Sequence, residues 1–282
     1  MIDNIKYKRI IIFLSLTVVF LLISNFAVLR KLEITQRANQ IVPSEKEVLD
    51  KEPTIVKVPK ESIGTIILII DDFGYRNDEV SDGFLDLNVP ITCAIIPGHP
   101  QSSKFAKKAV AAGQEVIIHM PMESSLELIG EEDYKIKTGM TSEEIEWRIE
   151  EVLKEIPEAI GMNNHQGSKA TADGKIMSVV ASVLKRNNKY FLDSRTTSNT
   201  VGEKSMRVIG VRTASRHVFL DNNSSIESIS EQIDELVSFA TKRGVAIGIG
   251  HAKPNTLKVL EQKIPELLKA GFKFDFASNV VN

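Results

Sequence analysis

The sequence predicts an α/β fold, a distorted (β/α) barrel of seven or eight parallel strands, over residues 63–282. Short β-rich segments alternate with longer helical ones, and this alternation is typical of a parallel barrel or a doubly wound sheet. Two of the β-rich segments, residues 66–70 and 245–249, are apolar at every position. Strands in a parallel sheet that helices cover on both faces need this pattern. The number and length of the strands favour the barrel.

Eight strands and five helices are expected from the local hydrophobic patterns. The strands fall at residues 65–70, 91–96, 115–118, 159–162, 189–192, 207–211, 246–249 and 273–276. The helices fall at residues 103–112, 142–156, 174–186, 226–242 and 256–270.

Several of the expected helices carry start and stop signals. Thr141 and Glu144 have the spacing of a capping box before residues 142–156, and Pro157 blocks continuation of that helix. A glycine follows three of the helical segments at the point where a left-handed terminus is expected. These glycines are Gly113, Gly244 and Gly271.

The N-terminal region contains a long uncharged segment. Residues 10–29 are mostly Ile, Leu, Val and Phe, and 20 such residues are enough to cross a bilayer as a helix. Lys6, Lys8 and Arg9 precede it, which favours a cytoplasmic location for residues 1–9 and translocation of the chain beyond residue 29. We therefore expect a single-pass signal anchor in the cell membrane, with the remaining chain on the periplasmic or extracellular side. A cleaved signal peptide is the alternative interpretation.

Residues 30–62 form the expected connection between the anchor and the folded domain. They carry 13 charges and three prolines but few large apolar residues. Such a segment cannot bury enough surface to fold alone, so it is interpreted as a charged flexible linker.

Composition excludes some classes of protein. A formal net charge of -2 argues against a nucleic-acid binder, which would show a strong basic bias. Cys93 is the only cysteine, so the chain has no intrachain disulfide and no cysteine-based zinc site. Its apolar surroundings predict a buried strand thiol.

Polar residues follow five of the expected strands. In parallel α/β folds the carboxyl ends of the strands carry the active site. The polar segments are Asp71-Asp72-Phe73-Gly74, His119-Met120-Pro121-Met122-Glu123, Asn163-Asn164-His165-Gln166-Gly167-Ser168, Asp193-Ser194-Arg195 and Gly250-His251. Three of the five histidines and several carboxylates of the sequence therefore follow the carboxyl ends of expected strands.

The chemistry available to these side chains is that of a metal-dependent hydrolase. Imidazole and carboxylate are ligands for zinc and other divalent ions, and a catalytic site leaves one position for water. A second carboxylate can accept the water's proton, and a histidine on another strand can protonate the leaving group. Asp71 and Asp72 are expected on opposite sides of an extended strand, which would give them different roles.

Each of these residues also has a structural interpretation. An Asp-Asp pair at a strand end often forms a turn or caps a helix. A single histidine such as His119 is often a loop residue that only makes structural hydrogen bonds. One metal site would explain the whole set. His99 and His217 are weaker candidates. Arg195, Arg212 and Arg216 are either anion-binding or structural.

The quoted segments resemble, in order, the blocks of the divergent polysaccharide deacetylase family. The resemblance extends from about Thr65 to the C-terminus. It implies a distorted (β/α) barrel and the metal-dependent removal of N- or O-acetyl groups from carbohydrate.

By position, Asp71 resembles the family's general base, Asp72 its metal-binding aspartate, and His251 the late histidine that acts as general acid. His119 resembles the first histidine of a His-x-x-x-His metal pair, but Glu123 occupies the second position. The usual Arg-Pro-Pro block is absent as well. We therefore expect His165 to complete the metal set, with Glu123 as the alternative ligand.

Zinc is the favoured ion for this set. Three residues of the remaining blocks are expected to bind substrate: Asp193, Arg195 and Ser168.

The sequence supports three functional hypotheses. The first is a metal-dependent carbohydrate deacetylase of the cell envelope. The second is a non-catalytic, membrane-anchored protein that keeps the barrel to bind glycan or a protein partner, which the two departures from the family pattern motivate. A glycosidase that uses Asp71 and Asp193 is a third, but it leaves the histidines unexplained.

Overall fold

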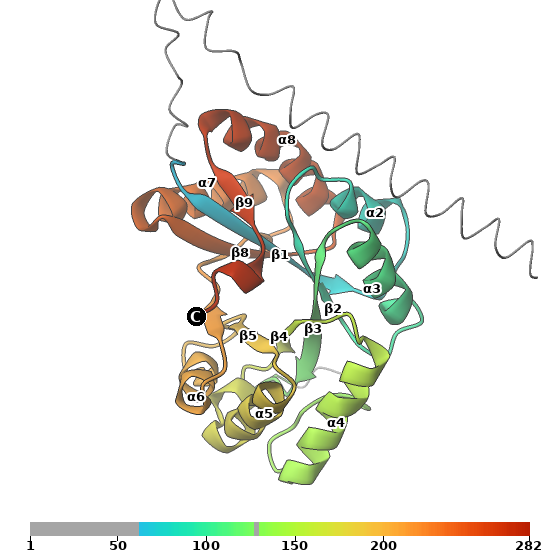
Figure 1. The fold of residues 1–282 in the computed structure, drawn as a ribbon. Coiled ribbons are helices and arrows are strands. Elements are labelled where there is room, and N and C mark those ends of the chain that lie inside the picture. The colour runs from blue at the N-terminus through green and yellow to red at the C-terminus, as the bar shows by residue number, and fades with distance from the viewer. Residues whose placement is uncertain (1–61, 127–129) are drawn as a thin grey trace, which may run out of the picture. The chain divides into compact units, whose positions relative to one another are not determined.

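The structure, a computed structural model, describes residues 62–126 and 130–282, which belong to one compact unit (Figure 1). Strands alternate with helices along this unit. The strands are β1 (Thr65–Phe73), β2 (Thr92–Ile95), β3 (Glu115–Met122), β4 (Gly161–Gln166), β5 (Tyr190–Asp193), β6 (Thr213–Ser215), β7 (Val218–Phe219), β8 (Val245–His251) and β9 (Lys273–Asp275). The helices are α2 (Glu79–Leu85), α3 (Ser102–Ala111), α4 (Ser142–Glu155), α5 (Gly174–Arg186), α6 (Gly202–Ile209), α7 (Ile226–Arg243) and α8 (Pro254–Ala270).

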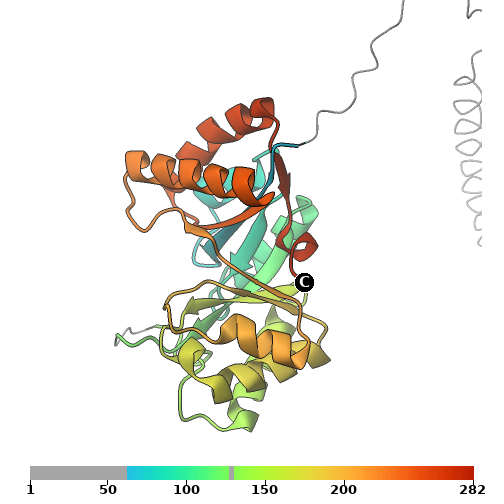
Figure 2. The same cartoon turned by 90° about the vertical axis from the view of Figure 1, so that its left-hand side faces the viewer.

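All strand pairs in the described residues are parallel, and the strands form one sheet in the order β6-β5-β4-β3-β2-β1-β8-β7. The short β9 pairs with the beginning of β1. The predicted parallel α/β fold is confirmed, but the sheet has nine strands rather than seven or eight. Figure 2 shows α7 and α8 at one end of the curled sheet and α5 and α6 at the other.

The curled sheet is a half-barrel with an open seam. β6 and β7 are consecutive in the chain but stand at opposite ends of the strand order. The two residues that join them cross the seam: the N–H of Arg216 donates to the carbonyl of Asp193, and the N–H of His217 donates to that of Ile247. The two edge strands, β6 and β7, are therefore connected by a short chain segment and do not pair with each other through hydrogen bonds.

Apolar residues cover both faces of the sheet, as predicted from residues 66–70 and 245–249, which are apolar at every position. Ile67 and Ile69 of β1 lie in one cluster with Leu192 and Ile249 on the inner face. Residues 66, 68 and 70 belong to the larger cluster beneath the helices. Burial of one such side chain is worth about 1.5–3 kcal/mol, so β1, buried on both faces, is a major contributor to stability.

The predicted helix signals are confirmed. The side chains of Thr141 and Glu144 form the capping box of α4. Gly244 and Gly271 end α7 and α8 in the left-handed conformation, with φ of 79° and 106°. The five predicted helices match α3, α4, α5, α7 and α8 with ends that differ by two residues or fewer.

The predicted strand at residues 207–211 is wrong. Most of this segment belongs to α6, which ends at the left-handed Gly210, and the strand follows at β6. Met206 of the helix is buried, whereas Val208 is 76% exposed, so the apolar residues here do not share one face of a strand. The short α2 and the two-residue β7 were not predicted.

The predicted cytoplasmic segment, signal anchor and linker at residues 1–62 fall, apart from residue 62, outside the described residues. Within the described residues no helix is long and apolar enough to cross a membrane.

Candidate metal centre and active site

Strand register brings the predicted site residues to one edge of the half-barrel. Asp71 of β1 is the register partner of His251 of β8. His119 of β3 is the partner of Asn163 of β4, and His165 lies two residues further along β4. Because all of these strands are parallel, their carboxyl ends meet on the same side of the sheet.

Asp72 has an unusual backbone. Its φ is +67°, in the left-handed region that few non-glycine residues adopt, and the register of β1 against β2 shifts between Ile70 and Phe73. As a result both carboxylates approach the same atom. The distances to Nε2 of His119 are 3.6 Å from Oδ2 of Asp71 and 3.5 Å from Oδ1 of Asp72. The prediction that the two carboxylates point to opposite sides is therefore wrong.

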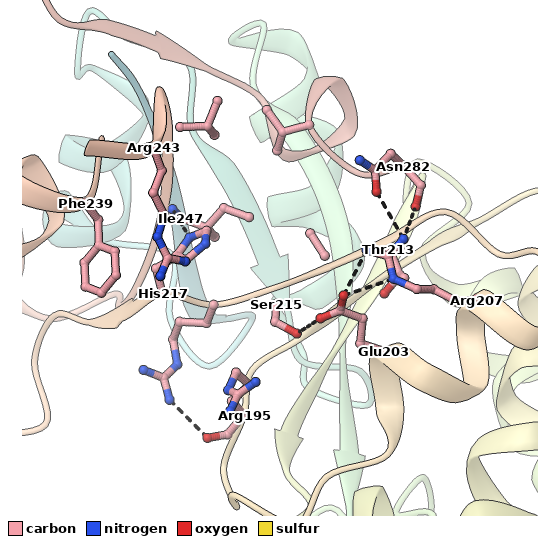
Figure 3. A pocket seen from close by; sticks show the side chains of 14 residues that line it. Arg195, Glu203, Arg207, Thr213, Ser215, His217, Phe239, Arg243, Ile247 and Asn282 are labelled. Carbon is pink, nitrogen blue, oxygen red and sulfur yellow. Dashed lines mark hydrogen bonds and ion pairs between the residues drawn. The ribbon is translucent and has the colours of Figure 1, made fainter. Parts of the chain in front are cut away.

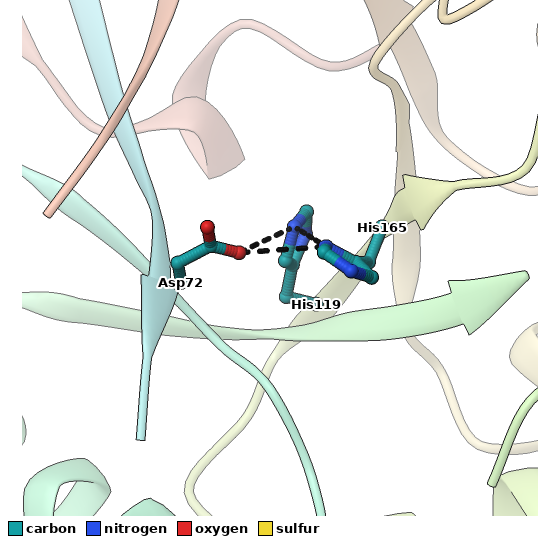
Figure 4. A group of neighbouring side chains, drawn as sticks. All are labelled: Asp72, His119 and His165. Carbon is teal, nitrogen blue, oxygen red and sulfur yellow. Dashed lines mark hydrogen bonds and ion pairs between the residues drawn. The ribbon is translucent and has the colours of Figure 1, made fainter. Parts of the chain in front are cut away.

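Asp72, His119 and His165 form a tight cluster (Figure 4). Oδ1 of Asp72 lies 3.5 Å from Nε2 of His119 and 3.4 Å from Nδ1 of His165, and the two nitrogens are 3.0 Å apart. Tetrahedral ligands at about 2.0–2.2 Å from a zinc ion lie about 3.3–3.6 Å from one another. Oδ1 of Asp72 is also buried without a hydrogen-bond partner. Both oxygen–nitrogen distances fall in the tetrahedral range, and the two nitrogens, at 3.0 Å, lie slightly closer together. These two distances, the unpartnered oxygen and the donor types fit one divalent ion.

Asn163 orients both His119 and Asp71. Its Oδ1 accepts a hydrogen bond of 2.8 Å from Nδ1 of His119, which leaves the lone pair of the ring on Nε2, facing the cluster. Its amide NH₂ donates to Oδ1 of Asp71 at 2.8 Å. A single buried amide thus fixes the tautomer of a candidate ligand and the position of the neighbouring carboxylate.

His165 is paired with Gln166. Nε2 of the ring lies 3.2 Å from the amide nitrogen of Gln166, whereas the amide oxygen is buried without a partner. Exchanging the oxygen and the nitrogen of this amide would let its oxygen accept from Nε2–H of His165. That tautomer leaves the lone pair of His165 on Nδ1, the atom that faces Asp72.

His251 is held by Asp221. Nδ1 of His251 donates to Oδ1 of Asp221 at 2.8 Å, and its backbone N–H donates to Oδ2. The hydroxyl of Thr256 also donates to Oδ2 of this buried carboxylate. Nε2 of His251 then faces the cluster, 3.8 Å from Oδ2 of Asp72. Asp221 was not predicted, although it ends the apolar run Val218-Phe219-Leu220 as the other site residues end theirs.

The local electrostatics shift the pKa values of the two aspartates in opposite directions. Burial raises the pKa of Asp71 above its ordinary value. Burial would also raise the pKa of Asp72, but the rings of His119 and His165, 3.5 and 3.4 Å from its Oδ1, hold it far below the ordinary range. One carboxyl group is thus inclined to take a proton and its neighbour to remain ionised.

The histidines respond to the same charges. Burial would lower the pKa of His119, but the negative charges of Asp71 and Asp72 raise it to about 9. Burial likewise opposes the charged form of His251, yet the hydrogen bond to Asp221 and the charge of Asp72 raise its pKa. Both rings therefore hold protons more firmly than a free imidazole does.

Glu123, the alternative ligand, lies outside the cluster. Its Oε2 accepts from the N–H and the hydroxyl of Thr138, and its Oε1 pairs with Nζ of Lys169 at 2.7 Å. The structure therefore brings His165, and not Glu123, to Asp72 and His119.

The residues predicted to bind substrate also lie outside the cluster. Oδ1 of Asp193 accepts from the N–H of Arg195, and its Oδ2 accepts from the hydroxyl of Thr200, so this buried carboxylate organises the loop after β5. The hydroxyl of Ser168 accepts from the N–H of Ser125. The side chain of Arg195 is exposed. Their contact with substrate stays a prediction.

The fold and the site together define an α/β half-barrel with one carboxylate and two histidines gathered at the carboxyl ends of its strands. The chain belongs to the divergent polysaccharide deacetylase family, whose model matches residues 68–281. The family resemblance that the strand-end motifs indicated is thus confirmed.

Two bacterial proteins are similar in sequence. The Escherichia coli protein YibQ is 37% identical over 204 residues, which cover 72% of this chain and 63% of that protein. A Haemophilus influenzae protein is 35% identical over 202 residues, 72% of this chain and 71% of the relative. The match thus spans less than two thirds of the Escherichia coli protein.

Two solved structures share the fold. An uncharacterized protein from Agrobacterium tumefaciens superimposes with a TM-score of 0.73 and 17% identity, over 77% of this chain and 89% of that chain. The catalytic domain of a peptidoglycan N-acetylglucosamine deacetylase from Eubacterium rectale has a TM-score of 0.53 and 16% identity, over 76% and 88% of the two chains. At these identities the likeness establishes the architecture alone.

Proposed function

We propose that the protein is a metal-dependent hydrolase that removes N- or O-acetyl groups from an envelope polysaccharide or oligosaccharide. The observation that carries this proposal is the cluster of Asp72, His119 and His165 with a protonatable carboxyl group and an oriented histidine beside it. Membership of the deacetylase family and the fold shared with a peptidoglycan deacetylase support the choice of substrate class.

Asp72, His119 and His165 would hold the divalent ion, for which zinc is the favoured identity. When bound, the ion would activate water for attack and polarise the acetyl carbonyl. Asn163 keeps the ligating lone pair of His119 on Nε2, and the low pKa of Asp72 keeps this carboxylate ionised.

Asp71 would act as the general base. Its Oδ1 is occupied by the amide of Asn163, whereas its Oδ2 faces the cluster, 3.6 Å from Nε2 of His119. Because burial raises its pKa, the carboxylate gains more from accepting a proton than an exposed aspartate would.

His251 would act as the general acid. Asp221 accepts from Nδ1 and stabilises the imidazolium, so the proton on Nε2 is the one directed toward the site. Donation of that proton to the departing amine or alcohol completes the hydrolysis.

Acetate release tests the proposal. The purified chain, loaded with zinc, should release acetate from N-acetylglucosamine oligomers or from O-acetylated xylan, and chelation should abolish the release. Asp71→Asn should lower the rate at least about 10²-fold, the usual contribution of a general base. Exposed Asp234→Asn is the matched control and should leave the rate unchanged. Absence of release from both substrates by the zinc-loaded chain would contradict the proposal.

A non-catalytic glycan- or protein-binding role is the second candidate. The observation that favours it is Glu123, which occupies the position of the second metal histidine and pairs with Lys169 and Thr138 instead. Binding of the same oligosaccharides without acetate release, unchanged in Asp71→Asn, would favour this candidate.

The cellular location is a proposal as well. The uncharged residues 10–29 and the basic residues before them support a signal anchor with the described unit outside the cytoplasm. Alkaline phosphatase fused after residue 62 should be active in cells, and an inactive fusion would contradict this location.

A further inference from the structure

The open seam of the half-barrel contains a groove of about 760 Å³ that is separate from the metal cluster. It runs between β6 at one edge of the sheet and the first residues of β8, which β7 at the other edge does not pair, beside the segment that crosses the seam. None of its lining residues belongs to the set Asp71, Asp72, His119, His165 and His251. The candidate metal ligands, the proposed general base and the proposed general acid therefore lie outside the groove, and Arg195 is the one lining residue that was predicted to bind substrate.

Four arginines line the groove, and one acidic residue does. Figure 3 shows Phe239, Arg243 and His217 on one side and Glu203, Arg207 and Asn282 on the other. The acid is already engaged: Glu203 pairs with Arg207 at 2.9 Å and accepts from the hydroxyl of Ser215. The charge of Arg207 is therefore compensated within the groove.

The other three arginines have no carboxylate within ion-pair distance in the described part of the chain. The guanidinium of Arg216 donates to the backbone carbonyls of Ser194 and Arg195 and lies over the ring of Phe219. The guanidinium of Arg243 lies over the ring of Phe239 at 5.0 Å. The side chains of Arg195 and Arg243 are exposed. Only longer-range attraction connects Arg195 to Glu203.

His217 adds a hydrogen-bond donor to this wall. Its Nδ1 accepts from the backbone N–H of Ile247 at 2.9 Å, so the neutral ring carries its proton on Nε2. Burial lowers the pKa of His217, and the charges of Arg243 and Arg195 lower it further, whereas that of Glu203 opposes them. The pKa of Arg216 is lowered by its burial and by the charge of Arg195, and the more distant charges of Asp71 and Asp193 oppose this only in part. The cationic side chains thus repel one another, and a bound anion would relieve that repulsion.

We propose that the seam groove is a binding site for a phosphate-class oxyanion, held by Arg195, Arg216 and Arg243 with His217 as a further donor. The planar guanidinium presents paired N–H donors that match the oxygens of a phosphate group. Three positive charges that lack an ion-pair partner among the described residues favour a dianion over a monocarboxylate or a neutral sugar. The arginines come from the loop after β5, the seam crossing and the end of α7, so only the folded half-barrel assembles them.

Calorimetric titration of the full chain with inorganic phosphate tests the site. The chain is first stripped of metal with a chelator, and chloride keeps the ionic strength constant. We expect saturable binding at one site per chain. Arg243→Gln should weaken it at least about tenfold, as expected for loss of one charge-assisted hydrogen bond. Arg195→Gln should weaken it as well.

The control is Arg186→Gln, because Arg186 is an exposed arginine on α5 that pairs with Glu146 and Glu150 and does not line the groove. Its phosphate affinity should equal that of the unmodified chain. Absence of saturable binding, or equal affinities of Arg243→Gln and Arg186→Gln with thermal unfolding curves intact, would overturn the proposal.

Asp72→Asn separates this site from the proposed metal centre. It should retain phosphate binding even if acetate release is lost, and loss of phosphate binding in this variant would assign the anion to the metal cluster and overturn the proposal. Glucose 1-phosphate distinguishes the source of the anion. Tighter binding than inorganic phosphate assigns the groove to a phosphorylated glycan, equal binding assigns it to free phosphate, and both results support an oxyanion site.

Discussion

Nδ1 of His251 donates a hydrogen bond of 2.8 Å to Oδ1 of Asp221, a carboxylate that is buried and also bound by the backbone of His251. This pair fixes the orientation of the imidazole and directs Nε2 toward Asp72. The proposed general acid therefore depends on a residue that does not itself reach the cluster.

Asp221→Asn should lower acetate release about 10²-fold or more, because the imidazolium loses its stabilising charge. The pKa of His251 should fall, so the alkaline limb of the pH–rate profile should move to lower pH. The profile of kcat against pH checks both effects, with the exposed Asp234→Asn as control. An unchanged alkaline limb would remove Asp221 from the mechanism.

Asn163→Ala should weaken zinc binding about 10–100-fold, the usual cost of losing a group that orients a ligating histidine. The substitution leaves Nδ1 of His119 and Oδ1 of Asp71 without their shared partner. Asn164→Ala is the matched control, because Asn164 is equally buried but bonds to Ser194 and Gln166. Competition with a fluorescent chelator measures the affinities, and equal values for the two variants would contradict this role.

Zinc affinity should depend on pH through His119. In the metal-free protein its pKa is raised to about 9, so a proton must leave before Nε2 can ligate. The apparent affinity should rise about tenfold per pH unit from about pH 6.5 to about pH 9 and then level off. Chelator competition at pH 6.5, 7.5 and 8.5 measures the slope. A flat profile would show that no protonated histidine competes with the metal.

The same proton affects the stability of the metal-free chain, with the opposite sign. A pKa raised above the unfolded value of about 6.5 stabilises the fold below that pH. This contribution should be lost as the pH rises through about 9. Chemical unfolding of the stripped chain at pH 6.5 and pH 9.5 measures the loss. The variant His119→Gln should show a smaller difference, because only His251, whose pKa is also raised, then contributes. An equal dependence in both chains would assign the effect to another group.

Gly161→Ala should destabilise the fold by about 1–3 kcal/mol through overpacking. A Cβ at this position would lie 2.6 Å from ring atoms of Tyr190, whose hydroxyl donates to the buried Glu115. Gly174→Ala is the control, because a Cβ there meets no atom within 4 Å. Urea unfolding compares the two, and equal midpoints would show that the ring of Tyr190 yields without cost.

Local sequence patterns predicted the parallel sheet and most of the candidate site. Asp72, His119 and His165 each follow an apolar strand, and the topology of parallel strands brings such positions together whatever the details of packing. The helices were predicted closely for the same reason, since caps such as Thr141 with Glu144 act over a few residues.

The remaining features depend on tertiary contacts. The left-handed turn at Asp72 is set by the shift of β1 against β2, which no local pattern indicates. Asn163 lies inside a strand, and sequence alone does not distinguish it from a buried polar residue whose hydrogen bonds are purely structural. Asp221 follows a strand of two residues, too short to show a period of alternation.

Anomalous diffraction at the zinc absorption edge, on crystals of the chain grown with zinc, tests the proposed metal centre most directly. We expect one anomalous peak per chain within about 2.0–2.2 Å of Oδ1 of Asp72, Nε2 of His119 and Nδ1 of His165. A peak coordinated by Glu123 in place of His165, or no peak at the carboxyl ends of β1, β3 and β4, would contradict it.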